Sequence, residues 1–370
     1  MSRRGTLRSG VHSNAIATGG GDTGSLMATG LYRAAVVVAL AIGSAGGCGP
    51  QVEGPVTVRV RESRRLMGAP WTITVHAASP AAGREAIAAA FSEIERLERI
   101  LSDYDPTSEL SRLSAAAPTP EPVPVGADLW VMLVRAEGMR EATAGAFDIA
   151  VGPLTSLWRQ ARRSGRLPQP DKLAAAKAAL GAGTVELLPE TQSVRLPKPG
   201  TRLDPGGIGM GYAADEALQV LAAHGIQSAM IDASGDVLVS AAPPGSDGWR
   251  IAIAPLRPGG EGDSIVLVHA AVTTSGDAYQ AVDIDGVRYS HIVDPRTGLG
   301  VTGPTMVSVV APDATTADAL ATAASVLGPV EGAAVIANWP DHCSARFAWR
   351  EQDADRVLTT FGWPGRSHEP

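Results

Sequence analysis

Apolar residues recur along the chain at two spacings, one typical of strands and the other of helices. Residues 56–77 predict two strands, with the alternation clearest at Trp71, Ile73 and Val75. Residues 83–102 predict a helix, because their apolar side chains fall on one face at helical spacing. That face consists of Ile87, Phe91, Ile94, Leu97 and Leu101. The first expected elements are therefore a pair of strands and an amphipathic helix.

The middle of the chain predicts shorter elements. Residues 114–127 contain four prolines and are expected to form a surface connection that is neither helix nor strand. A second amphipathic helix is expected over residues 128–142, and short strands at 185–188 and 194–196. The buried stripe of this second helix would consist of Leu129, Met132, Leu133, Ala136 and Met139.

The second half of the chain is rich in strands, which turn residues separate. A further helix is expected over about residues 316–328. Strands are predicted within residues 228–241, 249–255, 264–276, 289–295 and 305–312. The whole pattern predicts a mixed α+β fold with no repeat and no sharp internal boundary. We expect one catalytic unit with two lobes.

Composition identifies a globular protein and excludes some functions. Apolar residues make up 45% of the chain, which suffices for one large core or two coupled lobes. Glycine is abundant, with 42 residues, whereas aromatic residues make up only 4%. Loops and small-residue packing should therefore dominate over aromatic stacking. No basic patch indicates binding to nucleic acid, and no such partner is expected.

The first 50 residues differ from the rest. Arg33 precedes a short apolar run that ends in small residues and Cys48, which is the order of a secretory signal. The end of this run resembles a bacterial lipobox, in which the cysteine becomes the lipidated first residue. We expect residues 1–47 to be removed, 48–57 to form a lipid-anchored tether, and 58–365 to form the catalytic domain. The protein would then face the periplasmic or extracytoplasmic side of the bacterial cell envelope; a plain cleaved signal is the alternative.

Processing would change the charge and the use of cysteine. Removal of residues 1–47 takes away four arginines and one aspartate, which changes the formal charge from −7 to −10. Cys343 is the only cysteine besides Cys48. If Cys48 carries the anchor, no intrachain disulfide is available, so stability must come from the core.

Asp318 and Thr322 are four residues apart in the predicted helix 316–328. This spacing puts a carboxylate and a hydroxyl on one helix face within reach of a single ion, and hard oxygen ligands suit Mg²⁺. Alternatively, Asp318 only favours the positive N-terminus of the helix and Thr322 points outward.

A glycine cluster precedes another predicted helix, which runs through Leu218 and Leu221. Four glycines fall within residues 206–211, directly after Asp204. A backbone with few side chains followed by a helix N-terminus favours an anion. The spacing differs from the GxGxxG of dinucleotide-binding folds, and a tight turn into a helix is the alternative.

His291 lies where a predicted strand meets a turn that contains Asp294. Histidine is the side chain best suited to proton transfer near neutral pH. Alternatively, His291 is a structural hydrogen-bonding residue. A similar alternative applies to residues 145–154, where Phe147 and the following apolar residues could form only a buried strand.

Eight segments occur together in one order along the chain. They are MGAPWTITV (67–75), LSDYDPTSELSRL (101–113), GAFDIAVGPLTSLW (145–158), LDPGGIGMGYAADEAL (203–218), ASGDVLVS (233–240), TTSGDAY (273–279), YSHIVDPRTG (289–298) and ADALATAASVLG (317–328). In this order the chain resembles the ApbE family, the FAD:protein FMN transferases of bacterial envelopes. The resemblance implies an ApbE-like, T-fold-like α+β fold of mixed sheets and helices, with the active site in a cleft between two lobes.

The resemblance also implies a reaction and a site. FAD is the substrate, FMN passes to a threonine hydroxyl of an exported acceptor flavoprotein, and AMP leaves. The implied Mg²⁺ ligands are Gly207, Asp318 and Thr322. The implied flavin contacts are Met67, Tyr104, Ala146, Phe147, Asp148, Asp204, Met210, His291 and Ile292. Tyr104 and Phe147 would offer flat surfaces for a ring system.

The attacking hydroxyl must lose its proton, so a base is expected near it. His291 is the first candidate and Asp294 the second. The chain departs from the family pattern at Met210, where lysine or another polar residue is common, so weaker affinity for FAD is expected. Ser114 replaces a common asparagine, and the segment after Tyr279 lacks the usual aromatic residues, which would reshape the rim of the site.

Two other functions remain open at the level of sequence. A Mg²⁺-dependent FAD pyrophosphatase would use the same metal and base, with water in place of the threonine. A flavin-binding lipoprotein without turnover belongs to a different class. Met210 favours this last function, and the pair Asp318 and Thr322 argues against it.

Overall fold

The computed structural model describes residues 57–257, 262–276, 281–303, 305–352 and 354–365. These residues belong to one compact unit, Glu53–Pro370. The predicted signal, Cys48 and all of the tether except Thr57 lie outside the described residues, as does Tyr279. The predictions for those segments stay predictions.

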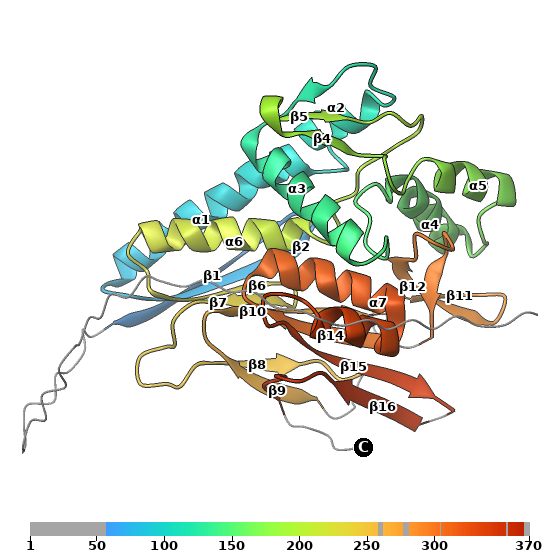
Figure 1. Ribbon diagram of the computed structural model, residues 1–370. Coiled ribbons are helices and arrows are strands. Elements are labelled where there is room, and N and C mark those ends of the chain that lie inside the picture. Colours follow the sequence, from blue (N-terminus) through green and yellow to red (C-terminus); the bar gives the residue numbers. More distant parts are fainter. Residues whose placement is uncertain (1–56, 258–261, 277–280, 304, 353, 366–370) are drawn as a thin grey trace, which may run out of the picture. The chain divides into compact units, whose positions relative to one another are not determined.

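An antiparallel sheet of eight strands is the largest element (Figure 1). Its strands, in spatial order, are β1 (Val58–Leu66), β2 (Ala69–Ala77), β6 (Ser228–Ala233), β7 (Asp236–Val239), β10 (Ala270–Gly276), β14 (Thr305–Ala311), β15 (Ser344–Glu351) and β16 (Ala354–Thr359). The strand order brings together segments that are distant in sequence. For example, Trp71 of β2 pairs with Ala233 of β6, so the hairpin β1–β2 lies beside the hairpin β6–β7.

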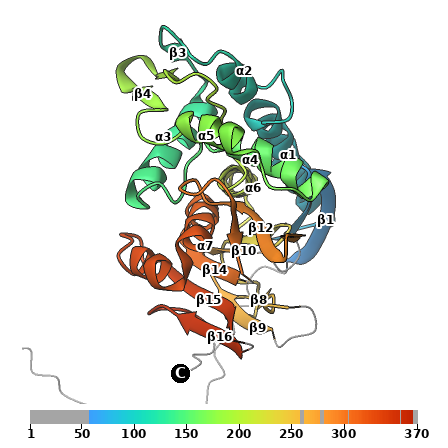
Figure 2. The same ribbon diagram turned by 90° about the vertical axis from the view of Figure 1, so that its right-hand side faces the viewer.

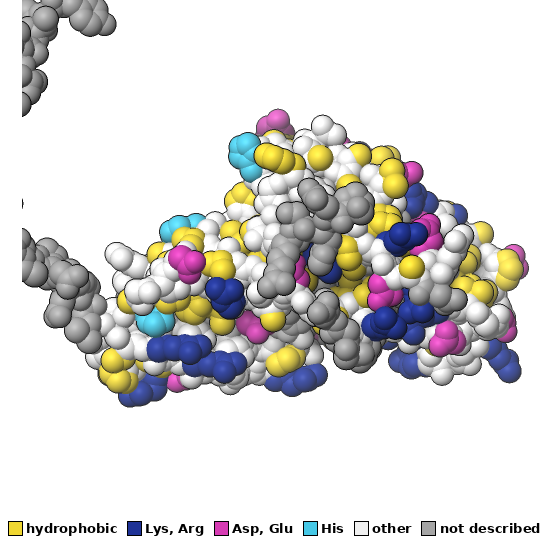
Figure 3. All heavy atoms as spheres, turned by 90° about the horizontal axis from the view of Figure 1, so that it is seen from below, with side chains coloured by type: hydrophobic (Ala, Val, Ile, Leu, Met, Phe, Trp, Pro, Cys, Tyr) yellow, Lys and Arg dark blue, Asp and Glu magenta, His cyan; other side chains and the backbone are white. Residues whose placement is uncertain are grey.

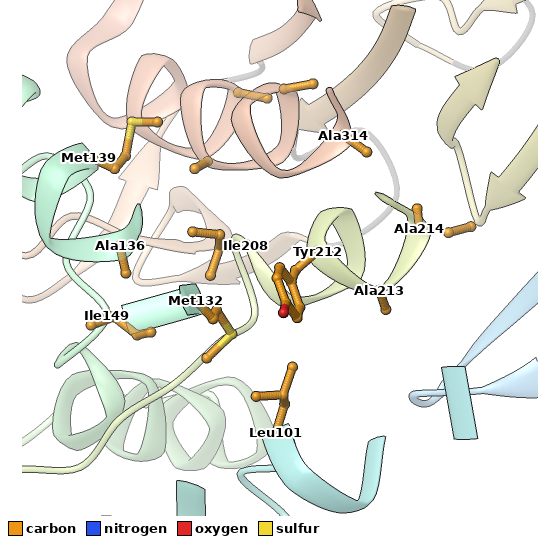
Figure 4. Close-up of a cluster of buried hydrophobic side chains, with 14 of the residues drawn as sticks. Leu101, Met132, Ala136, Met139, Ile149, Ile208, Tyr212, Ala213, Ala214 and Ala314 are labelled. Carbon is orange, nitrogen blue, oxygen red and sulfur yellow. The ribbon is translucent and has the colours of Figure 1, made fainter. Parts of the chain in front are cut away.

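Three helices cover one face of this sheet: α1 (Pro80–Leu101), α6 (Gly209–Ala223) and α7 (Ala314–Ala337) (Figures 1 and 2). The side chain of Ser79 caps α1 by accepting a hydrogen bond from the backbone N–H of Ala82. The apolar stripe predicted for α1 is fully buried. Ile208 and Tyr212, at the start of α6, lie together with Met132 of α3 (Ala127–Ala142) (Figure 4). This contact fixes the position of the segment that follows the glycines.

α7 is the longest helix that the structure describes, and it is broken near its middle. Its N-terminus is capped by Asp313, which accepts from the N–H of Thr316. Gly328 leaves the helical conformation at φ 78°, and Pro329 follows. By length and composition, α7 is the one helix of the described residues that could cross a membrane. Half of its most apolar window is buried inside the protein, as expected for a core helix.

The hairpin of β8 (Trp249–Ile253) and β9 (Asp263–Leu267) contributes a second hydrophobic cluster. Trp249, Ile251 and Ile265 are buried there with Val237 and Val272 of the large sheet. The hairpin lies on the side of the sheet opposite the three helices (Figure 1). The large sheet is therefore covered on both faces.

The remaining elements form two smaller layers. A three-stranded sheet consists of β3 (Val123–Pro124), β5 (Ser193–Arg195) and β4 (Glu186–Leu188), with a short 3₁₀ helix, η1 (Pro189–Thr191), between β4 and β5. Another consists of β11 (Ala281–Ile284), β12 (Val287–Val293) and β13 (Gly300–Thr302). The helices here are α2 (Glu109–Ala115), α3 (Ala127–Ala142), α4 (Gly152–Ser164) and α5 (Pro170–Ala178).

α4 connects to β12 through one large side chain. Trp158 is buried, and its indole Nε1 donates to the backbone oxygen of Ser290 at 2.9 Å. Its ring also meets the edge of Tyr289, with 5.4 Å between ring centroids. This contact holds the strand that carries His291 against the helix that follows Phe147.

Both edge strands of the large sheet carry charged side chains. β1 contains four arginines, including the exposed Arg59 and Arg61, and β16 contains Asp355 and Arg356. Seen from below, charged side chains lie interspersed with hydrophobic ones on the described part of the surface (Figure 3). Charges on edge strands oppose pairing with a further strand.

Most of the predicted elements are confirmed. β1, β2, α1, α3, α6 and the strands of the second half fall where the sequence predicts them, and the fold is α+β. The described residues form one unit, and the division into two lobes stays a prediction.

One prediction of local structure is wrong, and one of the alternatives is not observed. Residues 114–127 include the end of α2 and the two-residue strand β3. Pro124 is tolerated there because β3 lies at the edge of its sheet. Residues 145–154 form turns and the first turn of α4 rather than a buried strand.

Candidate functional site

A cavity of about 680 Å³ lies among α4, α6, α7, the β6–β7 turn, β10 and β12. Two predicted site residues, Met67 and Asp294, are absent from its described lining. The predicted residues that line it are Tyr104, Ala146, Phe147, Asp148, Asp204, Gly207, Met210, His291, Ile292, Asp318 and Thr322. Segments spread over more than two hundred residues of sequence therefore meet at one cavity.

Met67 occupies the tight turn between β1 and β2. It has a positive φ of 51°, and its backbone N–H donates to Glu98 Oε1 at 2.9 Å. Its methyl group lies 3.9 Å from the position that a Cβ would take on Gly209. Met67 thus lies against the start of α6, next to the cavity, and its neighbour in the lining is Ala69.

Asp294 holds a turn together with Arg296. Its Oδ1 accepts from the Arg296 backbone N–H at 2.8 Å and from Arg296 Nε at 3.0 Å. Arg296 Nη2 also donates to the backbone oxygen of Val326 in α7, at 3.1 Å. The Asp294 carboxylate therefore links the turn after His291 to α7. His291 itself lies in β12 and lines the cavity, which favours it over Asp294 as the candidate base.

The glycine segment forms a tight turn at Gly206 and approaches Thr322 closely at Gly207. Gly206 donates its N–H to Asp204 Oδ1 at 2.9 Å, which closes the turn. A Cβ on Gly207 would lie 2.8 Å from Thr322 Oγ1, so only glycine leaves room beside that hydroxyl. Gly209 and Gly211 already belong to α6. The prediction that residues 206–211 form one loop is therefore wrong for its second half.

Gly211 allows α6 and α7 to approach closely. A Cβ there would collide with the backbone oxygen of Ala314. The Gly211 N–H donates to Asp318 Oδ2 at 3.2 Å. From α6, the Asp215 carboxylate accepts the N–H groups of Ala314 at 2.8 Å and Thr315 at 2.9 Å, which caps the N-terminus of α7. These contacts fix where Asp318 points.

The carboxylates near α7 are buried close to one another. Burial, followed by the charge of Asp236, raises the pKa of Asp318 well above its usual range. Burial likewise raises the pKa of Asp236 to about 7. Burial also raises the pKa of Asp215. Like charges in a desolvated site favour either protonation or a bound cation.

The residues present fit a magnesium ion. Gly207 and Thr322 are in contact, Asp318 lies one helical turn before Thr322, and all three line the cavity. Hydroxyl, carboxylate and backbone oxygens are the ligands that Mg²⁺ prefers. In the described part of the chain, no three His, Cys, Asp or Glu side chains gather as a metal site. Mg²⁺ here would thus depend on few protein ligands and on a substrate's phosphates.

Asp148 lines the cavity, but its carboxylate is hydrogen-bonded to the protein backbone. Its carboxylate accepts from the N–H groups of Ala150 at 2.8 Å and Gly181 at 2.9 Å. Burial raises its pKa. Its contacts hold the Phe147 turn against the loop at Gly181.

The sequence left several lining residues unassigned. Asp236 lies at the start of β7, inside a segment of the family resemblance, but without its own motif. Thr155, Arg159 and Arg162 line the cavity from α4. The spacing of Leu154, Trp158 and Ala161, all buried, is a helical signal that would have located α4.

The fold and the cavity define an α+β protein in which aspartates, threonines and arginines line one site. Comparison with known proteins gives its family. The sequence profile of the ApbE family matches residues 67–347. The chain therefore belongs to the ApbE family.

Relatives of known name and structure cover most of the chain. An FAD:protein FMN transferase of Treponema pallidum (strain Nichols) is 34% identical over 333 residues, covering 84% of this chain and 89% of that protein. The flavin transferase ApbE from Vibrio cholerae has a TM-score of 0.74 at 27% identity, covering 83% of this chain and 98% of the other. The apo form of the Pseudomonas stutzeri flavinyl transferase ApbE has a TM-score of 0.73 at 26% identity, with 82% and 95% covered.

Proposed function

We propose that this protein is a Mg²⁺-dependent FAD:protein FMN transferase. It transfers FMN from FAD to a threonine hydroxyl of an acceptor flavoprotein and releases AMP. The names of the relatives support flavin transfer to a protein. Magnesium, the threonine target and AMP release are the parts that this proposal adds.

One observation carries the proposal: a single cavity combines all the predicted flavin-contact positions except Met67 with the predicted metal ligands. Tyr104 and Phe147 lie on its lining together with Gly207, Asp318 and Thr322. A dinucleotide such as FAD needs both a surface for its ring system and a place for its diphosphate. The cavity offers both.

The reaction balances with the groups present. The threonine oxygen attacks the phosphorus of the FMN half, the bond between that phosphorus and the bridging oxygen breaks, and AMP leaves with the bonding electrons. His291, which lines the cavity, accepts the threonine proton. Gly206 and Gly207 line the cavity without a side chain, and the diphosphate oxygens would lie beside them.

The proposed role of Mg²⁺ is to stabilise negative charge, and three residues would hold it. Bound Mg²⁺ neutralises charge that develops on the phosphoryl oxygens. Asp318 and Thr322 would hold it, with Gly207 as the third contact. Gly211 and Asp215 keep Asp318 and its helix in place through the hydrogen bonds described above.

Mass spectrometry of an acceptor protein tests the proposal. The unit from Glu53 onward is incubated with FAD, Mg²⁺ and an acceptor that contains a target threonine. A flavin adduct with release of AMP supports transfer. AMP with free FMN and no adduct indicates a pyrophosphatase instead. Intact FAD indicates a flavin-binding protein without turnover.

Substitution of Asp318 tests the metal ligand. Asp318→Ala should lower the Mg²⁺-dependent rate by about a hundredfold or more, because a buried charge opposite the cation is lost. Asp341→Ala removes an exposed aspartate and is the matched control. Equal rates in the two variants would exclude Asp318 as a ligand.

We also propose that the chain is anchored at Cys48 to the extracytoplasmic face of the membrane, where its acceptors are exported flavoproteins. The lipobox-like end of the apolar run supports this. Cys48→Ala should move the protein from the membrane fraction to the soluble periplasmic fraction of expressing cells. An unchanged distribution would contradict the lipid anchor.

A further inference from the structure

The guanidinium group of Arg159 lies between two buried carboxylates. Nη1 donates to Asp103 Oδ2 at 3.0 Å, and Nη2 donates to Asp204 Oδ2 at 3.0 Å. Asp103 and Asp204 are only 7% and 6% exposed. Ion pairs with partners this buried are far less screened by solvent than surface pairs.

The same guanidinium lies over the ring of Tyr104. Its Cζ is 4.6 Å from the ring centroid, which is within the range of a cation–π contact. Tyr104 is 73% exposed, so few other contacts restrain its ring. It lines both the main cavity and a smaller one of about 390 Å³. The position of this ring therefore affects the shape of both cavities.

The other side of the network leads to the glycine segment. Asp204 Oδ2 accepts from Thr155 Oγ1 at 2.6 Å, and Oδ1 accepts from the N–H of Gly206 at 2.9 Å. Thr155 and Arg159 lie one turn apart on α4, so one helix face holds Asp204 with two donors. The backbone next to Tyr104 is held by a hydrogen bond that does not involve Arg159: Arg202 Nη2 donates to the backbone oxygen of Asp103 at 2.6 Å.

We propose that Arg159 is a positioning residue that holds the Tyr104 ring at a fixed distance from the glycine segment and so shapes the flavin end of the cavity. The identity of the ligand rests on the proposed function. Arg159 lies outside the residues for which the family resemblance implies a role. It acts through Tyr104 and Asp204 and makes no part of the chemical step.

Arginine is needed at this position for geometric reasons. Its planar fork reaches two carboxylates at once, while its flat face lies over the ring. A lysine would supply one point charge and reach one partner. Methionine keeps the length and the apolar contact of the side chain but leaves Asp103 and Asp204 without a cation.

Binding of three ligands tests this role. Isothermal titration of the full-length chain with FAD, FMN and ADP separates the flavin end from the diphosphate. Arg159→Met should weaken binding of FAD and FMN about tenfold and binding of ADP by less than twofold. Arg159→Lys should not restore flavin affinity. Arg163→Met, on the exposed side of the same helix, should change none of the three.

A double variant tests whether Arg159 acts through Tyr104. Tyr104→Ala should weaken flavin binding to a similar extent, and Arg159→Met combined with Tyr104→Ala should weaken it no further. Additive losses, or an equal loss for ADP, would show that Arg159 has only a general structural role. If Arg159→Met does not fold, Asp103→Asn cuts one arm of the network and should show the same preference for flavin ligands.

The position of the ring can be observed without any ligand. In a crystal structure of ligand-free Arg159→Met, the Tyr104 ring should leave its place beside α4. A ring that stays in place would overturn the inference. If the unsubstituted chain binds no FAD, only the proposed function is contradicted. The crystal structure of Arg159→Met still tests whether Arg159 positions the Tyr104 ring.

Discussion

Asp236, to which the sequence assigned no role, makes the stability of the protein depend on pH. It lines the cavity near Asp318, and burial raises its pKa to about 7. An aspartate in the unfolded chain has a pKa of about 4. Between these values the folded state binds more protons than the unfolded state. The stabilising contribution of Asp236 to the free energy of unfolding is therefore fully present below about pH 4 and is lost as the pH rises through about 7.

Asp236→Asn should stabilise the metal-free protein at pH 8 by on the order of 1–2 kcal/mol, because it removes a buried charge. At pH 4.5 it should have little effect, since Asp236 is then protonated in the fold. Urea denaturation in EDTA at the two pH values measures this. Asp247→Asn, at an exposed position, is the control; if both substitutions act equally at pH 8, burial does not penalise Asp236.

Met210 lies in the first turn of α6 and lines the cavity with an apolar side chain. Met210→Lys would add a cation beside the proposed diphosphate position. We expect FAD and ADP to bind several-fold more tightly, with a gain that decreases at high salt. Titration at low and high ionic strength measures this, and Gln219→Lys, exposed on the same helix, is the control. Unchanged affinity would show that another residue already supplies the charge.

At the scale of elements, the close crossing of α6 and α7 determines the geometry of the site. Gly211→Ala would push a Cβ into the Ala314 carbonyl and displace the N–H that Asp318 accepts. We expect a loss of about 2–4 kcal/mol in the free energy of unfolding. Mg²⁺ binding should weaken as well, because Asp318 shifts. Urea denaturation measures the loss of stability, and calorimetry with FAD present measures Mg²⁺ binding.

Gly138→Ala is the matched control for Gly211→Ala. Gly138 lies inside α3, and a Cβ there would meet no atom within 4 Å. Alanine should therefore stabilise the protein by roughly 0.5–1 kcal/mol through helix propensity. If Gly211→Ala also stabilised the protein, the close approach of the two helices would not restrict this position.

The sequence predicts those elements whose apolar spacing is regular. α1 and α3 have clear stripes, and helical spacing alone predicts that Asp318 and Thr322 share one helix face. Spacing leaves their role as metal ligands open, and only the family resemblance implies it. α4 is not among the predicted elements, although Leu154, Trp158 and Ala161 have helical spacing and Pro153 lies where proline favours a helix start. Without α4, the contact between Arg159 and Tyr104 could not be predicted, since it joins residues 55 positions apart. The ion pairs of Arg159 with Asp103 and Asp204 span similar distances in sequence. The role of Gly211 likewise depends on α7, about a hundred residues later.

At the scale of the molecule, the cavity exists only when the large sheet, α4 and α7 are assembled, because its lining extends from Ala69 to Thr322. A ligand that binds there should stabilise the whole unit. At a hundred times its dissociation constant, a ligand adds about 2.7 kcal/mol. Thermal unfolding thus reports binding without turnover.

We predict that FAD and Mg²⁺ stabilise this protein cooperatively. The protein residues proposed to coordinate Mg²⁺ supply few charges of their own, so the ion should bind tightly only when the FAD phosphates also coordinate it. By reciprocity, bound Mg²⁺ should raise the affinity for FAD by the same factor. In thermal unfolding, the rise in midpoint with both ligands should exceed the sum of the two separate rises. Asp318→Asn should remove this excess while FAD alone still stabilises, because Tyr104 and Phe147, the proposed flavin contacts, lie outside α7. Strictly additive rises in the unsubstituted protein would mean that metal and diphosphate do not meet in this cavity.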